Sequence, residues 1–255
     1  MTAKRLPWDS AFFGRTVGRV DVSREDAASA EFLAAAIRDL DCELTYVFLP
    51  GGSADLAGQE LHRSALVALG GRLVDRKMTL SKRIGSMPAG QSATVAVATE
   101  LTAELEGLAY ASGWCSRFAL EERLRPFFRP LYRRWLENDL SNGRVFVKND
   151  ADGRPIGMVT VSISGEVGRI GLVAVDAHHC GRGIATELMN CAECWLDSHG
   201  AAECRVVTQA VNAGGVSLYV KCGYCVERTE EVWHVWHREV FATLGTVWCR
   251  PAGIP

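Results

Sequence analysis

The residues best suited to chemistry lie in one stretch, residues 173–188, where an apolar segment runs into a turn and then a helical pattern. Gly181 and Gly183 allow the backbone of that turn to approach a ligand, because neither has a Cβ to hold the ligand off. Several consecutive N–H groups would then point into one concavity at the positive end of the helix. The pattern indicates an anion cradle, although a glycine pair alone also fits a helix start made only for packing.

A dinucleotide-binding fold is one alternative for such a cradle. It would place three glycines early and an acidic residue about 20 positions later, whereas this chain has two glycines, placed late and preceded by the apolar segment 170–175. Residues 178–183 read His-His-Cys-Gly-Arg-Gly and instead resemble the pyrophosphate loop of the GNAT superfamily of N-acetyltransferases, Gln/Arg-x-x-Gly-x-Gly/Ala. His178 departs from the first position of that pattern.

A second motif strengthens the resemblance. The GNAT pattern continues with Asn, a helix containing Leu-Tyr, and Gly-aromatic, and this chain has Asn212, Leu218-Tyr219 and Gly223-Tyr224 in that order. Two motifs in the right order rarely arise together by chance. The resemblance covers residues 92–238 and implies a GNAT fold that uses acetyl-coenzyme A (acetyl-CoA) as its co-substrate.

The resemblance also implies roles for individual residues. Tyr219 matches the tyrosine that the superfamily uses as general acid toward the coenzyme A sulfur, and we predict it to be catalytic. The N–H groups of a splayed central strand are expected to hold the pantetheine and polarise the thioester carbonyl. The predicted cofactor-binding residues are Leu172, Val173, Ala174, Val175, Cys180, Gly181, Arg182, Gly183, Ile184, Ala185 and Asn212.

Amide formation also needs a neutral amine beside the thioester. No general base stands out: Glu166, His178, His179 and His234 qualify only by residue type. An amine on a sugar ring titrates low enough for solvent to remove its proton. We therefore name no base.

A narrower resemblance extends over the whole chain. Four segments look like the TDP-fucosamine acetyltransferases: residues 6–14, Ser116-Arg117-Phe118, residues 132–137 and residues 169–172. This resemblance implies an amino group on a nucleotide-linked dideoxy sugar as acceptor. Arg117, Phe118 and Tyr132 are the predicted substrate-binding residues; a guanidinium suits a diphosphate, while aromatic residues at helical spacing more often form core. Another small amine, such as an amino acid, a peptide N-terminus or an aminoglycoside, and a non-catalytic coenzyme A-binding module are the alternatives.

The composition limits the kinds of binding partner to expect. With 28 Lys and Arg against 30 Asp and Glu, nothing global attracts nucleic acid or anionic lipid. No apolar run reaches about 18 residues and the start has no apolar signal region, so we expect a cytoplasmic protein with no membrane or nucleic-acid partner. A homodimer through sheet edges is a hypothesis from the resemblance alone.

The cysteines argue for reduced thiols rather than disulfides. The chain has nine, an odd count, scattered through a length that can fold without them. Two C-x-x-C pairs, at residues 191–194 and 222–225, raise zinc as an alternative, but their separation exceeds the usual spacing and the first pair occupies the apolar stripe of a helix. A redox role and ligation by the adjacent histidines are disfavoured as well. We expect no metal.

The elements that position these residues follow from periodicity and turn formers. Helices are predicted at residues 30–40, 56–69, 100–110, 120–140 (broken or kinked at Pro126 and Pro130), 183–199 and 214–222. Strands are predicted at residues 44–49, 72–80, 145–147, 156–163, 169–175, 203–207 and 226–236.

This order predicts an α/β class with a mixed (α+β) sheet: a GNAT fold preceded by a partial GNAT-like lobe. The predicted domains are residues 1–88 and 92–240, joined at the turn-rich segment 85–92, and a tail at 241–255. A weak repeat, residues 66–76 against 219–228, supports the relation between the lobes. Leu66 stands where the second copy has Tyr219, so only the second lobe is equipped for chemistry.

Overall fold

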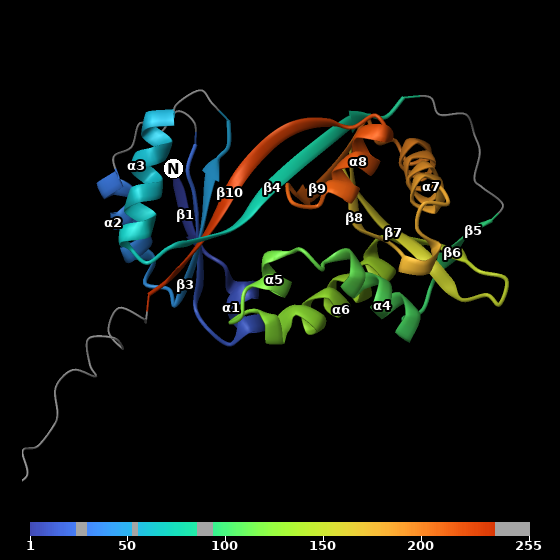
Figure 1. The fold of residues 1–255 in the computed structure, drawn as a ribbon, viewed down its shortest axis with the longest axis horizontal. Coiled ribbons are helices and arrows are strands. Elements are labelled where there is room, and N and C mark those ends of the chain that lie inside the picture. Colours follow the sequence, from blue (N-terminus) through green and yellow to red (C-terminus); the bar gives the residue numbers. More distant parts are fainter. Residues whose placement is uncertain (24–29, 53–55, 86–93, 238–255) are drawn as a thin grey trace, which may run out of the picture. The chain divides into compact units, whose positions relative to one another are not determined.

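The computed structural model describes residues 1–23, 30–52, 56–85 and 94–237. The chain divides into two compact units, one formed by Met1–Arg76 with Thr229–Pro255 and the other by Lys77–Arg228 (Figure 1). We call them unit 1 and unit 2. Helices and a mixed sheet occur in the chain, which confirms the predicted α/β class.

The division between the units differs from the boundary predicted at residues 88–92. Strand β4 (Arg72–Arg83) continues unbroken past residue 76, and from Lys77 to Arg83 it pairs with a strand of unit 2. Strand β10 (Cys225–Trp236) likewise starts in unit 2 and ends in unit 1. Because β4 and β10 each continue from one unit into the other, no turn-rich or polar segment marks the division in the sequence. Most of the predicted linker and the predicted tail at 241–255 lie outside the described residues.

Unit 1 is built on a mixed set of strands. Strand β1 pairs antiparallel with β2, β2 pairs parallel with β3, and β3 pairs antiparallel with β10. An apolar cluster that includes Leu33, Ile37 and Val47 forms its core. Besides β10 and the start of β4, its elements are β1 (Thr2–Arg5), α1 (Pro7–Phe13), β2 (Val17–Asp21), α2 (Ala30–Leu40), β3 (Leu44–Pro50) and α3 (Leu56–Ala68).

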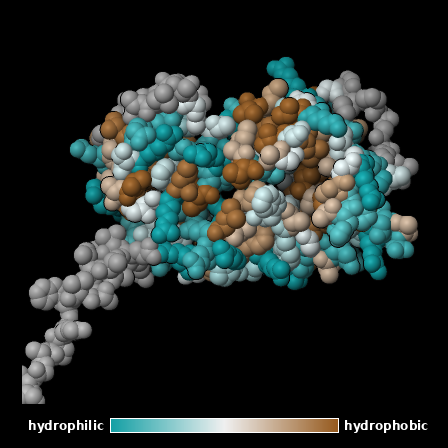
Figure 2. Space-filling model, viewed as in Figure 1, coloured by the Kyte–Doolittle hydropathy of each residue, from teal (hydrophilic) through white to brown (hydrophobic). Residues whose placement is uncertain are grey.

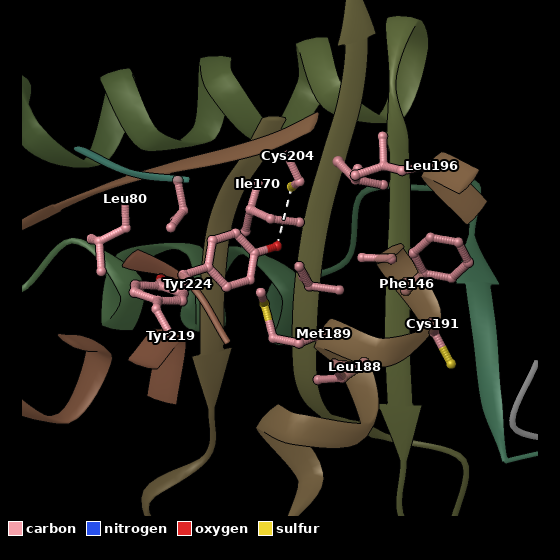
Figure 3. Close-up of a cluster of buried hydrophobic side chains, with 14 of the residues drawn as sticks. Leu80, Phe146, Ile170, Leu188, Met189, Cys191, Leu196, Cys204, Tyr219 and Tyr224 are labelled. Carbon is pink, nitrogen blue, oxygen red and sulfur yellow. Dashed lines mark hydrogen bonds between the residues drawn. The ribbon is translucent and has the colours of Figure 1, made fainter. Parts of the chain in front are cut away.

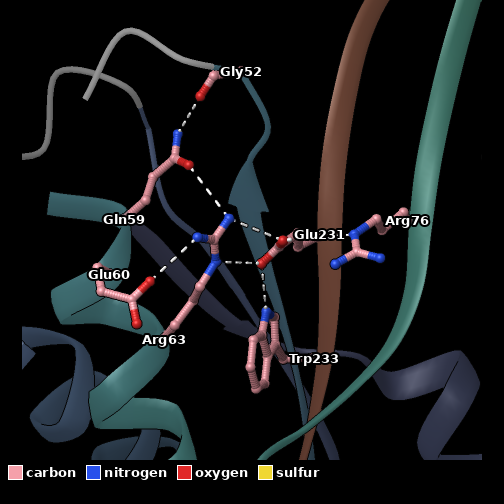
Figure 4. Close-up of polar contacts among 7 residues, drawn as sticks. All are labelled: Gly52, Gln59, Glu60, Arg63, Arg76, Glu231 and Trp233. Carbon is pink, nitrogen blue, oxygen red and sulfur yellow. Dashed lines mark hydrogen bonds and ion pairs between the residues drawn. The ribbon is translucent and has the colours of Figure 1, made fainter. Parts of the chain in front are cut away.

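A buried carboxylate ties α3 to β10 in unit 1 (Figure 4). Glu231 is 7% exposed and accepts two hydrogen bonds from Arg63, Nε to Oε2 and Nη2 to Oε1, both at 3.0 Å. Trp233 Nε1 donates a further bond to Oε2 at 3.2 Å, and Arg76 Nε lies 3.8 Å from Oε1. The paired guanidinium satisfies a charge that would otherwise be costly to bury.

Unit 2 contains the strands in the order β4, β9, β8, β7, β6, β5. Strands β8 and β9 pair parallel, whereas the other neighbours are antiparallel. Besides β4 and the start of β10, its elements are β5 (Val95–Ala98), α4 (Ala103–Ser112), α5 (Arg117–Leu120), α6 (Arg125–Asn142), β6 (Arg144–Asn149), β7 (Pro155–Ser164), β8 (Val167–Val175), a 3-10 turn (Ala177–His179), α7 (Ile184–Ser198), β9 (Glu203–Gln209) and α8 (Ala213–Lys221).

Helices cover both faces of the sheet in unit 2. On one face α7 places Leu188 against Val159 and Ile170. On the other face α4 and α6 pack, and Leu136 meets Met158 there. Both faces of β7 are therefore buried along residues 157–161, which explains why this stretch is apolar apart from Thr160.

Most predicted elements are confirmed, and the exceptions have physical reasons. The helix predicted at residues 120–140 begins only at Arg125, as α6, while Leu120 is the last residue of the separate short helix α5. Pro126 lies in the first turn of α6, where its missing N–H costs nothing. Pro130 does not end α6, which continues to Asn142. Four elements were not predicted from the sequence: β1, α1, β2 and β5.

Candidate active site

The pairing between strands β8 and β9 ends partway along both strands, in the middle of the sheet in unit 2. Their parallel pairing runs from Val167 opposite Glu203 to Ile170 opposite Val206. In the part of the chain that the structure describes, residues 171–175 of β8 have no partner on β9. Apolar surface gathers over the part of unit 2 where Figure 1 shows these strands (Figure 2), and Val207 on β9 is 47% exposed. The two strands therefore separate after Ile170.

A β-bulge interrupts β8 where the splay begins. Val159 of β7 pairs with Val173 and Val161 pairs with Ile170, so that Gly171 and Leu172 oppose Thr160 alone. The N–H of Leu172 donates to Thr160 Oγ1 at 2.9 Å. That amide is therefore already engaged, whereas Val173, Ala174 and Val175 continue the ladder with β7.

The turn after β8 is organised by its own side chains. Asp176 Oδ1 accepts from the N–H of His178 and lies 2.9 Å from His179 Nδ1. These contacts lower the pKa of Asp176, the bond with His179 contributing most. Arg182 Nη2 donates to the carbonyl of His178 at 3.2 Å. The two histidines thus shape the turn, and the side chain of His178 is exposed.

Two glycines of the turn take the left-handed conformation at the start of α7. Gly181 and Gly183 have φ of +76° and +80°, and a Cβ on either would meet no heavy atom within 4 Å. Gly183 is the N-cap of α7 and makes no side-chain cap. Among the described residues, no acceptor is assigned to the N–H groups of residues 180–186. Unpaired amides at a helix N-terminus, with open space above the glycines, fit a diphosphate.

Asn212 caps the next helix. Its Oδ1 accepts from the N–H of Gly215 at 3.0 Å, and its Nδ2 donates to Thr208 Oγ1 at 3.1 Å. The side chain therefore fixes the start of α8 and joins it to the end of β9. Its predicted role in holding the cofactor stays a prediction.

Tyr219 lies on α8 in the apolar core of unit 2 (Figure 3). It is 5% exposed, and its ring packs edge-on against Tyr224 with 6.2 Å between the ring centroids. Burial raises the pKa of Tyr219 well above its usual range, with the thiols of Cys222 and Cys115 adding to the effect. The hydroxyl thus stays protonated at neutral pH, as a general acid must.

The predicted substrate-binding residues do not form one exposed wall. Phe118 and Tyr132 are buried in an aromatic cluster, where Trp135 meets Phe118 at 5.8 Å and Tyr132 at 4.8 Å between ring centroids. This favours the core alternative for both rings. Arg117 is half-buried, and its guanidinium lies 4.7 Å from the centre of the Phe118 ring.

The polar groups beside the bulge were not predicted from the sequence. Thr160 is fully buried on β7, and its side chain hydrogen-bonds Asp139 of α6. Gly171, inside a strand pattern, was the one available signal, because glycine within a strand often marks a bulge. Among the residues named as candidate bases, His234 is buried in unit 1.

Within residues 1–23, 30–52, 56–85 and 94–237, no three His, Cys, Asp or Glu side chains gather in a way that could hold a metal ion. No helix within these ranges has the length and apolar character needed to cross a membrane.

Comparison with known proteins defines the class. Residues 110–224 match the Acetyltransferase (GNAT) family. A crystal structure of a GCN5-related N-acetyltransferase from Sphaerobacter thermophilus has the same fold, with a TM-score of 0.60 and 14% identity, over 91% of this chain and 75% of that one. The chain contains a GNAT acetyltransferase domain and is an acetyl-CoA-dependent N-acetyltransferase.

Two further relatives carry more particular names. The dTDP-fucosamine acetyltransferase of Escherichia coli O6:H1 is 28% identical over 88% of this chain and 93% of its own length. A fungal glucosamine N-acetyltransferase region within a multi-domain β-N-acetylglucosaminidase is 15% identical, with a TM-score of 0.54, over 91% of this chain and 31% of that one.

Proposed function

We propose that this enzyme transfers the acetyl group of acetyl-CoA to the amino group of a sugar linked to a nucleoside diphosphate. The observation that carries the donor half is the row of N–H groups at residues 180–186 without an assigned acceptor among the described residues. The acceptor half rests on the resemblance to a dTDP-fucosamine acetyltransferase along most of the chain.

The donor would lie along the turn and the splayed strand. The coenzyme A diphosphate would accept hydrogen bonds from the cradle, where the two glycines leave space for it. The amides of Cys180, Arg182, Ile184 and Ala185 complete this cradle. The pantetheine would follow β8 at residues 173–175, where β9 has left the strand.

Tyr219 would supply the proton for the departing thiolate. The amine nitrogen attacks the thioester carbon, and the tetrahedral oxyanion then collapses as the carbon–sulfur bond breaks and the sulfur takes the tyrosine proton. The raised pKa of Tyr219 keeps that proton available. Solvent would remove the proton from the attacking amine, since no described group has been assigned as base.

For the acceptor, we propose that Arg117 contacts its diphosphate, while Phe118 and Tyr132 form the packed wall behind that contact. A reaction that joins acetyl-CoA to a nucleotide sugar fits the cytoplasm. A homodimer stays a prediction that light scattering after size-exclusion chromatography would test.

The test is a panel of acceptors with the purified full chain and acetyl-CoA, and mass spectrometry to detect acetylated product. We expect turnover with TDP- or UDP-linked amino sugars and little with amino acids, peptides or aminoglycosides. Turnover with one of the latter alone would replace the acceptor half of the proposal. Calorimetry that shows no acetyl-CoA binding at millimolar concentration would overturn the donor half.

A further inference from the structure

Thr160 occupies an unusual place for a hydroxyl group, in the middle of β7 with no exposed surface. A hydroxyl has one proton to donate and two lone pairs to accept with. One lone pair receives the N–H of Leu172 at 2.9 Å, and the side chain also hydrogen-bonds the carboxylate of Asp139. The Thr160 hydroxyl therefore donates its proton to Asp139, and its oxygen accepts the N–H of Leu172 on the neighbouring strand β8.

The space around this hydroxyl is reserved by a glycine. A Cβ on Gly171 would collide with Thr160 Oγ1 and would lie 3.4 Å from Asp139 Oδ2. The contact between Thr160 and Asp139 therefore requires a residue without a side chain at position 171. Burial raises the pKa of Asp139, and its bond with Thr160 opposes that rise.

The bulge decides which way the following residues face. Ile170 and Val173, three positions apart, both pack into the core beneath α7. Leu172 and Ala174 pack on the other face, against α4 and α6. In a regular strand residues three apart point to opposite faces, so the extra residue at the bulge sets the orientation of all of residues 172–175. Residues 173–175 among them are the ones proposed to hold the pantetheine.

We propose that Thr160 and Asp139 are positioning residues that hold the bulge of β8 and thereby fix the donor-binding strand in its binding orientation. This inference rests on the proposed donor site. The Asp139 carboxylate orients the Thr160 hydroxyl, and the hydroxyl holds the amide of Leu172 in a place that no water reaches. Neither residue needs to touch acetyl-CoA for its loss to weaken donor binding.

The decisive variants separate the hydroxyl of Thr160 from its methyl group. Thr160→Val keeps the shape but leaves the Leu172 amide without an acceptor, so the strand shifts to satisfy it. Thr160→Ser keeps the hydroxyl and loses only the methyl group. We expect about a tenfold rise in the KM for acetyl-CoA in Thr160→Val, about the cost of one lost buried hydrogen bond, and a KM near that of the wild type in Thr160→Ser.

Further variants test the carboxylate and the substitution itself. Asp139→Asn retains an oxygen that can accept from Thr160 and should keep the KM low, whereas Asp139→Ala should raise it. Thr79→Val is the matched control, because Thr79 is also a buried strand threonine of unit 2, and its hydroxyl has no assigned partner among the described residues. It should leave the KM for acetyl-CoA unchanged.

Calorimetry with acetyl-CoA distinguishes the two ways to fail. If the wild-type enzyme does not bind acetyl-CoA, the proposed function fails. If the wild type binds and Thr160→Val binds equally well, the positioning role is refuted while the donor site stands. If Thr160→Val does not fold, the other variants decide. A KM for acetyl-CoA that rises in Thr160→Ser, which lacks only the methyl group, would refute the positioning role. Equal KM values in Asp139→Asn and Asp139→Ala would refute it as well.

Discussion

Two glycines with the same backbone conformation allow the anion cradle to be tested cleanly. Gly183 in the cradle has φ of +80° and Gly153, in the turn between β6 and β7, has φ of +79°. A Cβ on either residue would meet no protein atom within 4 Å. Alanine at either position therefore imposes the same strain on the protein, while only alanine at 183 places a methyl group where the coenzyme A diphosphate would lie.

The magnitudes follow from the conformation and from the contacts at risk. Alanine in the left-handed region costs about 1–2 kcal/mol, so both variants should lose that much stability. Hydrogen bonds to a charged group contribute about 1.5–3 kcal/mol. Loss of one such bond in Gly183→Ala would raise the KM for acetyl-CoA about ten- to a hundredfold, whereas Gly153→Ala should retain the wild-type KM.

The assay needs to avoid thiol reagents, because Cys180 and Cys225 are exposed and would react with them. Chromatographic detection of free coenzyme A serves instead, with urea denaturation to compare the two stabilities. Equal KM values for the two variants, at equal losses of stability, would mean that the backbone at Gly183 does not contact the donor. The cradle would then be a helix start made for packing alone.

Three more predictions concern other parts of unit 2. Tyr219→Phe should lower kcat about a hundredfold or more with little change in the KM for acetyl-CoA; since the pKa of Tyr219 is raised, the wild-type kcat should show no loss of this acid below about pH 10. Iodoacetamide should label Cys180 and Cys225, and acetyl-CoA should protect only Cys180, as peptide mass spectrometry would show. Lys82→Met should cost about 3–5 kcal/mol in urea denaturation, because it leaves Glu193, which is fully buried, without its cation at 2.5 Å.

Each of these has an outcome that would count against it. Wild-type turnover in Tyr219→Phe would remove the hydroxyl from the acid role. If acetyl-CoA protects the two cysteines equally, or protects neither, the donor does not bind at the cradle. Lys148→Met is the control for Lys82→Met, since its partner Glu187 is partly exposed and the pair should contribute less than about 1 kcal/mol; equal losses would show that burial of Glu193 is not the reason.

Local patterns explain why much of the fold could be predicted. The apolar stripe of residues 184–196 and the glycine after it specify α7 through contacts close in sequence. The alternation in residues 203–207 specifies β9 in the same way. The backbone conformation of the cradle could be predicted in the same way, because glycine spacing between a strand and a helix is a local signal. Thr2–Arg5 and Val95–Ala98 are short strands, and they depend on partners elsewhere for their definition.

The features that could not be predicted depend on contacts between distant residues. Thr160, Gly171 and Asp139 belong to three different elements, and no spacing in the sequence shows that they meet. The pattern of Phe118 and Tyr132 predicted aromatic side chains, but only the tertiary packing shows that they are buried. The unit division was missed for a related reason: β4 and β10 are regular strands, and only their partners change along their length.

The weak repeat supports placing the proposed chemistry in unit 2. In each unit a helix ends at a glycine with positive φ and a long strand follows, α3 with Gly70 before β4 and α8 with Gly223 before β10. The first copy has Leu66, fully buried, where the second has Tyr219. A leucine has no proton to give to a thiolate, and no glycine-rich turn like that of residues 178–183 precedes it in the sequence. The shared local geometry therefore specifies a fold, and in the function we propose the tyrosine and the cradle add the means for catalysis to one copy alone.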